Sequence, residues 1–213
     1  MNIFHSNHIN SVKDYLTKHR FSKHELEEIR QTYDGQDILI TGATGGLGLS
    51  LLSILVLSKS QPRKIILAGK RNQVESHWNQ FGQIKKISIV NIKNAQIKDH
   101  KLKNPIIFHL AGYGQPAKFM TDPSALVYLN TEMIFDLMSL EPQSISYVST
   151  TEIYSGQTIS CDEKTSTIIK PEHPRAPYVF SKLLGESILR NSTCQTGVFR
   201  VALATPPMFY GDD

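Results

Sequence analysis

The sequence has few cysteines and no long apolar run, and therefore lacks the features that mark disulfide-bonded, secreted and membrane proteins. It holds only two cysteines, Cys161 and Cys194, which fit no disulfide or metal-ligand pattern and indicate a reducing, cytoplasmic setting. No apolar run approaches the ~18 residues that a membrane span requires, and the polar first ten residues do not form a secretion signal. We therefore expect a cytoplasmic protein that is neither secreted, embedded in a membrane, nor built around a metal.

Long runs of one charge are also missing. The formal net charge is +4, from 23 Lys and Arg against 19 Asp and Glu, and the lysines are scattered among acids. This pattern does not favour a nucleic acid as partner, and an anionic small molecule explains the same charge at least as well. The 213 residues, of which 40% are hydrophobic and 20% charged, are typical of a globular chain with one sizeable core.

Short apolar runs alternate with helix-like stretches from residue 37 onward. Continuous apolar strands separated by helices predict a parallel sheet covered on both faces, which is a doubly wound α/β domain over residues 37–213. The six expected strands are Ile38–Thr41, Lys64–Ala68, Ile87–Val90, Ile106–Leu110, Ile145–Ser149 and Val198–Leu203. The expected helices are Gly46–Ser58, a weaker one around Gln73–Phe81, Pro123–Leu140 and Tyr178–Asn191.

Residues 1–36 differ in composition from the rest and predict a helical extension of two short helices. Their apolar residues recur at helical spacing, first at Ile9, Val12 and Leu16 and then at Leu26, Ile29 and Tyr33. Ser22 and Glu25 form a capping-box pattern, and Gly35 is a natural stop for the second helix. The extension either packs on the main domain or serves as an arm for binding a partner.

A glycine-rich segment joins the first expected strand to the first helix of the α/β domain. Gly42 permits a tight turn, Gly45 lets the backbone approach a pyrophosphate, and Gly48 lets the helix pack closely on the sheet. The phosphates would then meet the helix N-terminus, whose N–H groups and dipole favour negative charge. We expect this loop to bind a dinucleotide through Gly42, Thr44, Gly45, Leu47 and Gly48.

The second expected strand ends without the acid that usually binds the ribose hydroxyls of NAD. Lys70 and Arg71 stand there instead, and a cation at this point can hold a 2′-phosphate, which favours NADP over NAD. The alternative is a solvated basic turn, and the sequence leaves that choice open. The expected cofactor is therefore NAD(P), with a preference for NADP.

A tyrosine and a lysine lie one helical turn apart. Tyr178 and Lys182 share a helix face, and a nearby ammonium lowers the pKa of a phenol, as a general acid or base requires. Thr150 and Glu152 follow the fifth strand, at the sheet edge where ligands bind in open α/β folds. Thr150 can donate to a substrate oxygen, whereas Glu152 either removes a substrate proton or caps a turn.

These motifs together resemble those of the extended short-chain dehydrogenases/reductases, the NAD(P)-dependent nucleotide-sugar epimerases, dehydratases and decarboxylases. The family pattern TGxxGxxG begins at Thr41, and the pattern YxxxK begins at Tyr178. The run from Ser149 to Tyr154 is similar to the family's STSEVYG segment, and the segments 114–120 and 173–178 are similar to those of UDP-glucuronate decarboxylase-like members. The resemblance implies further cofactor contacts from Asn91, Ile92, Leu110, Ala111, Gly112, Asn130, Tyr178 and Lys182.

The resemblance also implies a reaction. Tyr178 would take a proton from a hydroxyl of a UDP- or dTDP-linked sugar, giving a transient 4-keto sugar, while Lys182 holds the ribose and Thr150 polarises the sugar oxygen. Glu152 would act on the neighbouring carbon in a dehydration or decarboxylation. Members of the family often dimerise through helices that correspond to Pro123–Leu140 and Tyr178–Asn191, so a homodimer is compatible with the resemblance.

The chain departs from the family pattern at three places. The acid after the second strand is missing, Asn91 stands where an Asp commonly meets the adenine, and the RxxxxYGP turn is altered after Arg200. The chain also ends where family members continue, so we expect most of the C-terminal substrate domain to be absent. Two alternatives to the enzyme therefore stay open: a dinucleotide-binding module that is regulatory or needs a partner chain, and an NADP-dependent carbonyl reductase of the same family.

Overall fold

The computed structural model describes residues 21–43, 45–69, 87–91, 97, 100–112 and 122–202. The described residues divide into two compact units, one formed by those up to residue 110 and the other by those from residue 111 to residue 202. Among the described residues, no helix is both long enough and apolar enough to span a membrane.

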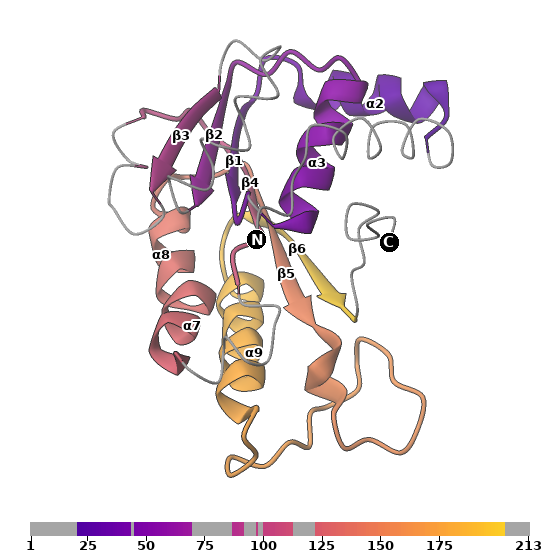
Figure 1. Cartoon of the computed structure of the whole chain (residues 1–213), viewed down its shortest axis with the longest axis vertical. Helices are drawn as coiled ribbons and strands as arrows, with labels where there is room; N and C mark the ends of the chain where they lie inside the picture. Colours follow the sequence, from indigo (N-terminus) through magenta and orange to yellow (C-terminus); the bar gives the residue numbers. More distant parts are fainter. Residues whose placement is uncertain are drawn as a thin grey trace, which may run out of the picture. The chain divides into compact units, whose positions relative to one another are not determined.

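The first unit contains four parallel strands in the order β3-β2-β1-β4 (Figure 1). Every residue of β1 is buried, as its continuous apolar run predicts for the centre of a parallel sheet. Side chains of β1, β2 and α3 form one core cluster, which includes Ile38, Ile40, Leu52, Leu55, Ile65 and Leu67. The elements of this unit are α2 (Lys23–Tyr33), β1 (Asp37–Thr41), α3 (Gly46–Leu57), β2 (Lys64–Gly69), β3 (Ile87–Asn91) and β4 (Ile106–His109).

Helix α2 begins with the predicted capping box. The Ser22 backbone N–H donates to Glu25 Oε2 at 2.6 Å, and the Glu25 N–H donates to Ser22 Oγ at 3.2 Å. Gly35 follows the helix with a φ of +73°, a left-handed conformation that suits glycine. The first helix of the expected extension, with Ile9, Val12 and Leu16, lies outside the described residues. The boundary at residue 36 stays a prediction.

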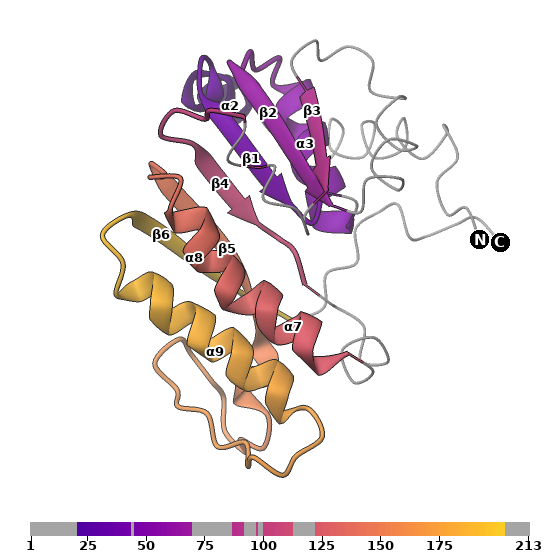
Figure 2. The same cartoon turned by 90° about the vertical axis from the view of Figure 1, so that its left-hand side faces the viewer.

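The second unit pairs two parallel strands and covers them with helices. Strand β5 aligns with β6 so that Ser149 faces Arg200 and Thr150 faces Val201. Helices α7, α8 and α9 lie on the same side of these strands (Figure 2). The elements are α7 (Pro123–Asn130), α8 (Glu132–Met138), β5 (Ser144–Thr150), the 3-10 helix η2 (Thr151–Tyr154), α9 (Ala176–Arg190) and β6 (Gln195–Val201).

The single helix expected over Pro123–Leu140 is wrong, because the structure has two helices there. Thr131 separates them, with φ −130° and ψ −73°, far from helical values. Its hydroxyl donates to the carbonyl of Val127 at 2.7 Å, a bond to the preceding turn that often bends helices. Helix α9 also begins at Ala176, two residues before the expected start.

Parallel strands alternating with helices confirm the expected α/β class. Each predicted apolar run overlaps an observed strand, and most boundaries differ by one or two residues. The weaker helix expected around Gln73–Phe81 lies outside the described residues.

Candidate active site

The glycine loop has the steric features that the motif predicts. Gly42 adopts a φ of +68°, and its N–H donates to the carbonyl of Ala68 at 3.0 Å. A Cβ on Gly48 would lie 2.7 Å from both Ala43 Cα and the Gly42 carbonyl oxygen, so only glycine lets α3 start this close to the turn. Gly45 and Leu47 are exposed beside the N-terminus of α3. Thr44 lies outside the described residues.

The expected contacts to the adenosine end of a dinucleotide are described only in part. Asn91 ends β3 and is paired in register with Gly69 of β2. Lys70, Arg71 and Ile92 lie outside the described residues. The preference for NADP, which depends on Lys70 and Arg71, therefore stays a prediction.

The end of β4 is tied to the end of β1 beside the glycine loop. His109 is fully buried, with its Nδ1 atom 2.7 Å from Thr41 Oγ1. The N–H of Leu110 donates to the Thr41 carbonyl at 3.2 Å. Leu110 is thereby held at the same edge of the sheet as Gly42.

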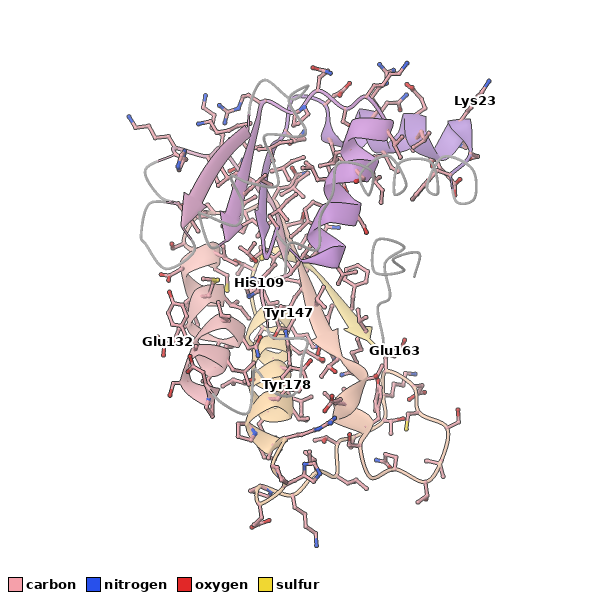
Figure 3. The ribbon with its side chains drawn as sticks, viewed as in Figure 1. Lys23, His109, Glu132, Tyr147, Glu163 and Tyr178 are labelled. Atoms are coloured by element: carbon pink, nitrogen blue, oxygen red, sulfur yellow. The ribbon has the colours of Figure 1, made fainter. Side chains whose placement is uncertain are left out.

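In the second unit, Tyr178 lies in the first turn of α9 (Figure 3). Its ring packs with Leu126, Ile153 and Val179, and the side chain is only 8% exposed. This burial raises the pKa of the Tyr178 phenol, whereas a hydrogen bond with the Thr150 side chain lowers it. The structure thus brings together the tyrosine and the threonine that the sequence predicts as catalytic partners.

Lys182 lies one turn further along α9 and is buried. Its Nζ atom donates to the carbonyl of Val148 at 2.7 Å and lies 4.8 Å from the centre of the Tyr147 ring. Burial lowers the pKa of Lys182 to about 7, and the carboxylate of Glu186 opposes that shift. Near neutral pH, the lysine is therefore poised between its charged and neutral forms.

Gly112 and Asn130 lie beside this lysine. A Cβ on Gly112 would be 3.3 Å from Lys182 Nζ and 3.9 Å from Asn130 Oδ1. The Asn130 side-chain N–H donates to Ser181 Oγ at 2.9 Å, but its Oδ1 atom is buried with no hydrogen-bond partner among the described residues. An unpaired buried acceptor is costly, and a bound ligand or water would satisfy it. Ala111, which precedes Gly112, is also buried.

The carboxylate of Glu152 forms an ion pair and does not cap the turn. Its Oε1 atom lies 3.0 Å from Arg175 Nη1, and its Oε2 atom is buried without a hydrogen-bond partner in the described part of the chain. The turn is capped by Thr150, whose Oγ1 accepts from the Glu152 N–H at 3.2 Å. Glu152 and Arg175 have opposite effects on the Tyr178 phenol, the first raising its pKa and the second lowering it.

Glu186 and Arg200 form a second charged cluster, one helical turn beyond Lys182, that the sequence does not predict. Glu186 is 3% exposed, and both of its carboxylate oxygens accept hydrogen bonds from Arg200, the shortest at 3.0 Å from Nε to Oε1 and at 2.7 Å from Nη2 to Oε2. Arg200 Nη1 also donates to the Tyr154 hydroxyl at 2.6 Å and to the backbone carbonyl of Glu163 at 2.9 Å. The only local signal was that Glu186 follows Lys182 by one helical turn.

The structure therefore brings Gly112, Asn130, Thr150, Tyr178 and Lys182 together within residues 111–203, with Glu152 next to Thr150. Gly42, Gly45, Leu47, Gly48 and Leu110 belong to the other unit. Each group has a geometry suited to a bound dinucleotide: a glycine turn at a helix N-terminus in one, and an orphaned acceptor beside a lysine in the other.

A protein-family model described as "NAD dependent epimerase/dehydratase family" matches residues 38–213. No curated protein sequence matches the chain. Among solved structures, it is similar to UDP-glucuronic acid 4-epimerase from Bacillus cereus in complex with NAD, at 16% identity and a TM-score of 0.58, over 78% of this chain and 56% of that one.

Two further structures show similar agreement. The first is UDP-N-acetylglucosamine 4-epimerase from Methanobrevibacter ruminantium M1 in complex with UDP-N-acetylmuramic acid, with 14% identity, a TM-score of 0.60, and coverage of 78% of this chain and 55% of that one. The second is an NAD-dependent NDP-hexosamine 5,6-dehydratase involved in tunicamycin biosynthesis, with 19% identity, a TM-score of 0.56, and coverage of 78% and 54%. The chain spans little more than half the length of these proteins, and at these identities the likeness concerns the fold.

Proposed function

Because the chain belongs to the NAD-dependent epimerase/dehydratase family, we propose that it is an NAD(P)-dependent enzyme acting on a nucleotide sugar through a transient 4-keto intermediate. The observation that carries the proposal is the buried phenol of Tyr178, hydrogen-bonded to Thr150 and one helical turn from Lys182. Epimerisation, dehydration and decarboxylation all begin with the removal of a proton from a sugar hydroxyl while hydride leaves the carbon.

The residues of the site suit the dinucleotide. Gly42, Gly45 and Gly48 would hold the pyrophosphate, with Thr44 and Leu47 completing the loop. Asn91 and Ile92 would meet the adenine, while Leu110, Ala111, Gly112 and Asn130 would line the nicotinamide half and Lys182 would bind its ribose. When bound, NAD(P) supplies an acceptor for the hydride and a store from which the hydride can return.

Tyr178 is the proposed general base. Its raised pKa keeps the phenol protonated in the free protein at neutral pH, so proton removal depends on a nearby positive charge. Lys182 would supply that charge in its ammonium form, because an ammonium favours the phenolate. Thr150 would hold the reacting sugar oxygen against the phenol by donating a hydrogen bond.

Glu152 is the proposed second base when the reaction is a dehydration or a decarboxylation. Its Oε1 atom is ion-paired with Arg175, and a carboxylate can accept a proton from the neighbouring carbon. Thr151, at the start of η2, would assist there. An enzyme that only epimerises would not need either group, so Glu152→Gln separates these reactions by its effect on turnover.

The proposed substrate is a UDP- or dTDP-linked sugar, and the proposed assembly is a homodimer. Two of the similar structures are named for UDP-sugars, which supports this substrate class. Large apolar side chains are exposed on the helices of the second unit, namely Val127 on α7, Phe135 on α8, and Phe180 and Leu184 on α9. Exposed apolar side chains of this size are often found at interfaces between subunits. A cytoplasmic location is proposed from the two free cysteines.

Thermal unfolding with NAD, NADP and UDP-sugars, each added separately and in combination, tests the proposal. A ligand that prefers the folded protein raises its melting temperature, so the enzyme should respond to a dinucleotide and further to a nucleotide sugar. A response to dinucleotide alone, with no turnover, would instead indicate a binding module. No response to any of them would contradict the proposal. An NADP-specific response with reduction of simple carbonyl compounds would indicate the reductase that Lys70 and Arg71 favour.

A further inference from the structure

Lys182 and Glu186 form a buried pair of ionisable groups on α9. They are one helical turn apart and therefore lie on the same face of the helix, where they are 4% and 3% exposed. A buried ammonium loses its hydration, so an uncompensated Lys182 would be driven to its neutral form. The carboxylate of Glu186 acts against this loss.

The two side chains are held by consecutive residues of β5. Lys182 Nζ donates to the carbonyl of Val148 at 2.7 Å, and Ser149 Oγ donates to Glu186 Oε1 at 2.5 Å. Two consecutive residues of β5 therefore hold the side-chain ends of Lys182 and Glu186 in place.

Glu186 is kept ionised by cations on its other side. Arg200 of β6 grips both carboxylate oxygens, and Arg190 of α9 approaches Oε2 at 3.4 Å. Burial alone would raise the pKa of Glu186, but the hydrogen bonds from Arg200 and Ser149 lower it. A permanent negative charge therefore lies one turn from Lys182.

We propose that Glu186 is a positioning residue: its carboxylate, fixed by Arg200 and Ser149, stabilises the ammonium form of the Lys182 side chain, which is directed at Val148 and the Tyr147 ring. In the described part of the chain, the other ionisable groups beside the lysine are Tyr147 from β5 and Tyr178 from α9, and neither is an anion near neutral pH. The consequence for catalysis rests on the proposed function, because Tyr178 needs that ammonium to lose its proton. The effect of Glu186 on the protonation of Lys182 is independent of the proposed function.

A purely structural role for Glu186 is the alternative, in which its pair with Arg200 only ties α9 to β6. The two roles differ in their effect on proton binding. Loss of a structural tie lowers stability by a similar amount at every pH, whereas loss of a charge next to Lys182 moves the pH at which the lysine loses its proton.

The test measures the pKa of Lys182 in Glu186→Gln and in a matched control, Arg190→Gln, which removes only the exposed outer partner. The pKa is obtained by comparing the pH dependence of urea unfolding with and without Lys182→Met in each background. We expect Glu186→Gln to lower the pKa of Lys182 by about one pH unit, a tenfold change in proton affinity, and Glu186→Asp to restore most of it. Arg190→Gln should leave that pKa unchanged or slightly raised.

An unshifted pKa in folded Glu186→Gln would overturn the inference. Should this variant fail to fold because Arg200 is left unpaired, Glu186→Gln with Arg200→Gln removes both charges together. The Lys182 pKa should then still fall, but by less, because loss of the Arg200 cation acts in the opposite direction. In an active enzyme, Glu186→Gln should also move the alkaline limb of the kcat/KM profile to lower pH by about one unit. A shifted pKa in a protein that never turns over nucleotide sugars would uphold the inference and contradict the proposed function.

Discussion

Replacing Lys182 by methionine should change how the stability of the protein depends on pH. The pKa of Lys182 falls from 10.5 to about 7 on folding because burial disfavours the ammonium. Between these two values the unfolded chain binds more protons than the folded one, so the free energy of unfolding of the wild type rises with pH. Below pH 7 the lysine is charged in both states, and the full cost of burying it is present.

The size of this pH dependence follows from the difference between the two pKa values of Lys182. At about 1.4 kcal/mol per pH unit, the interval from 10.5 to about 7 corresponds to about 5 kcal/mol of destabilisation at low pH, which disappears towards pH 10.5. Methionine has a similar length and no charge, so Lys182→Met removes this dependence. It also leaves the carbonyl of Val148 without its donor, at a cost of about 1–3 kcal/mol that does not vary with pH.

The assay is urea unfolding of the wild type and of Lys182→Met at several pH values from 6 to 10. The stability of the wild type relative to the variant should rise by about 1.4 kcal/mol per pH unit above pH 7, or by about 3 kcal/mol between pH 7.5 and 9.5. Subtracting the variant removes the other titrating groups from the comparison. A constant difference across this range would show that the lysine is not desolvated in the folded protein, and would refute the reasoning.

Three further predictions concern close packing and the cofactor. Gly48→Ala would bring a Cβ to 2.7 Å from Ala43 Cα. It should lower the free energy of unfolding by about 1–3 kcal/mol in urea unfolding and weaken dinucleotide binding in calorimetry. Gly45→Ala, whose Cβ would lie 3.3 Å from one carbonyl oxygen, should have a much smaller effect on both. Gly185→Ala would press a Cβ against the Asn130 carbonyl oxygen and should destabilise the second unit by a similar amount, with Ser187→Ala as the exposed control on α9. Equal stabilities of the two variants would disprove the close approach. Arg71→Ala should weaken binding of NADP more than that of NAD, and equal losses in calorimetry would remove the preference for NADP.

The fold could be read from the sequence because its strands are buried on both faces. Continuous apolar runs such as Ile38–Thr41 have no other stable location in an α/β protein, so their positions were predicted to within a few residues. The break at Thr131 was missed because apolar spacing continues across it, and only the backbone dihedral angles reveal the two helices. Apolar periodicity carries little information about where a helix begins or ends.

The candidate site was predicted where its residues are close in sequence or belong to a motif. Tyr178 and Lys182 share one helix, and Gly48 belongs to a loop whose steric need is local. The pair of Glu186 with Arg200 could not be predicted, since it joins a helix to a strand through tertiary packing that no local pattern encodes. The same holds for the ion pair of Glu152 with Arg175. The sequence left open that the Glu152 carboxylate caps a turn, whereas in the structure it is ion-paired.

The most direct test of the proposed reaction compares turnover and cofactor affinity in Tyr178→Phe. The substitution removes one oxygen and keeps the ring that packs with Leu126 and Val179, so the fold and dinucleotide affinity should change little. Tyr128→Phe, on α7, is the matched control. With a UDP-sugar substrate, Tyr178→Phe should lose at least about a hundredfold in kcat while the Kd for the dinucleotide stays within about twofold, and Tyr128→Phe should match the wild type. Undiminished turnover in Tyr178→Phe would contradict the account.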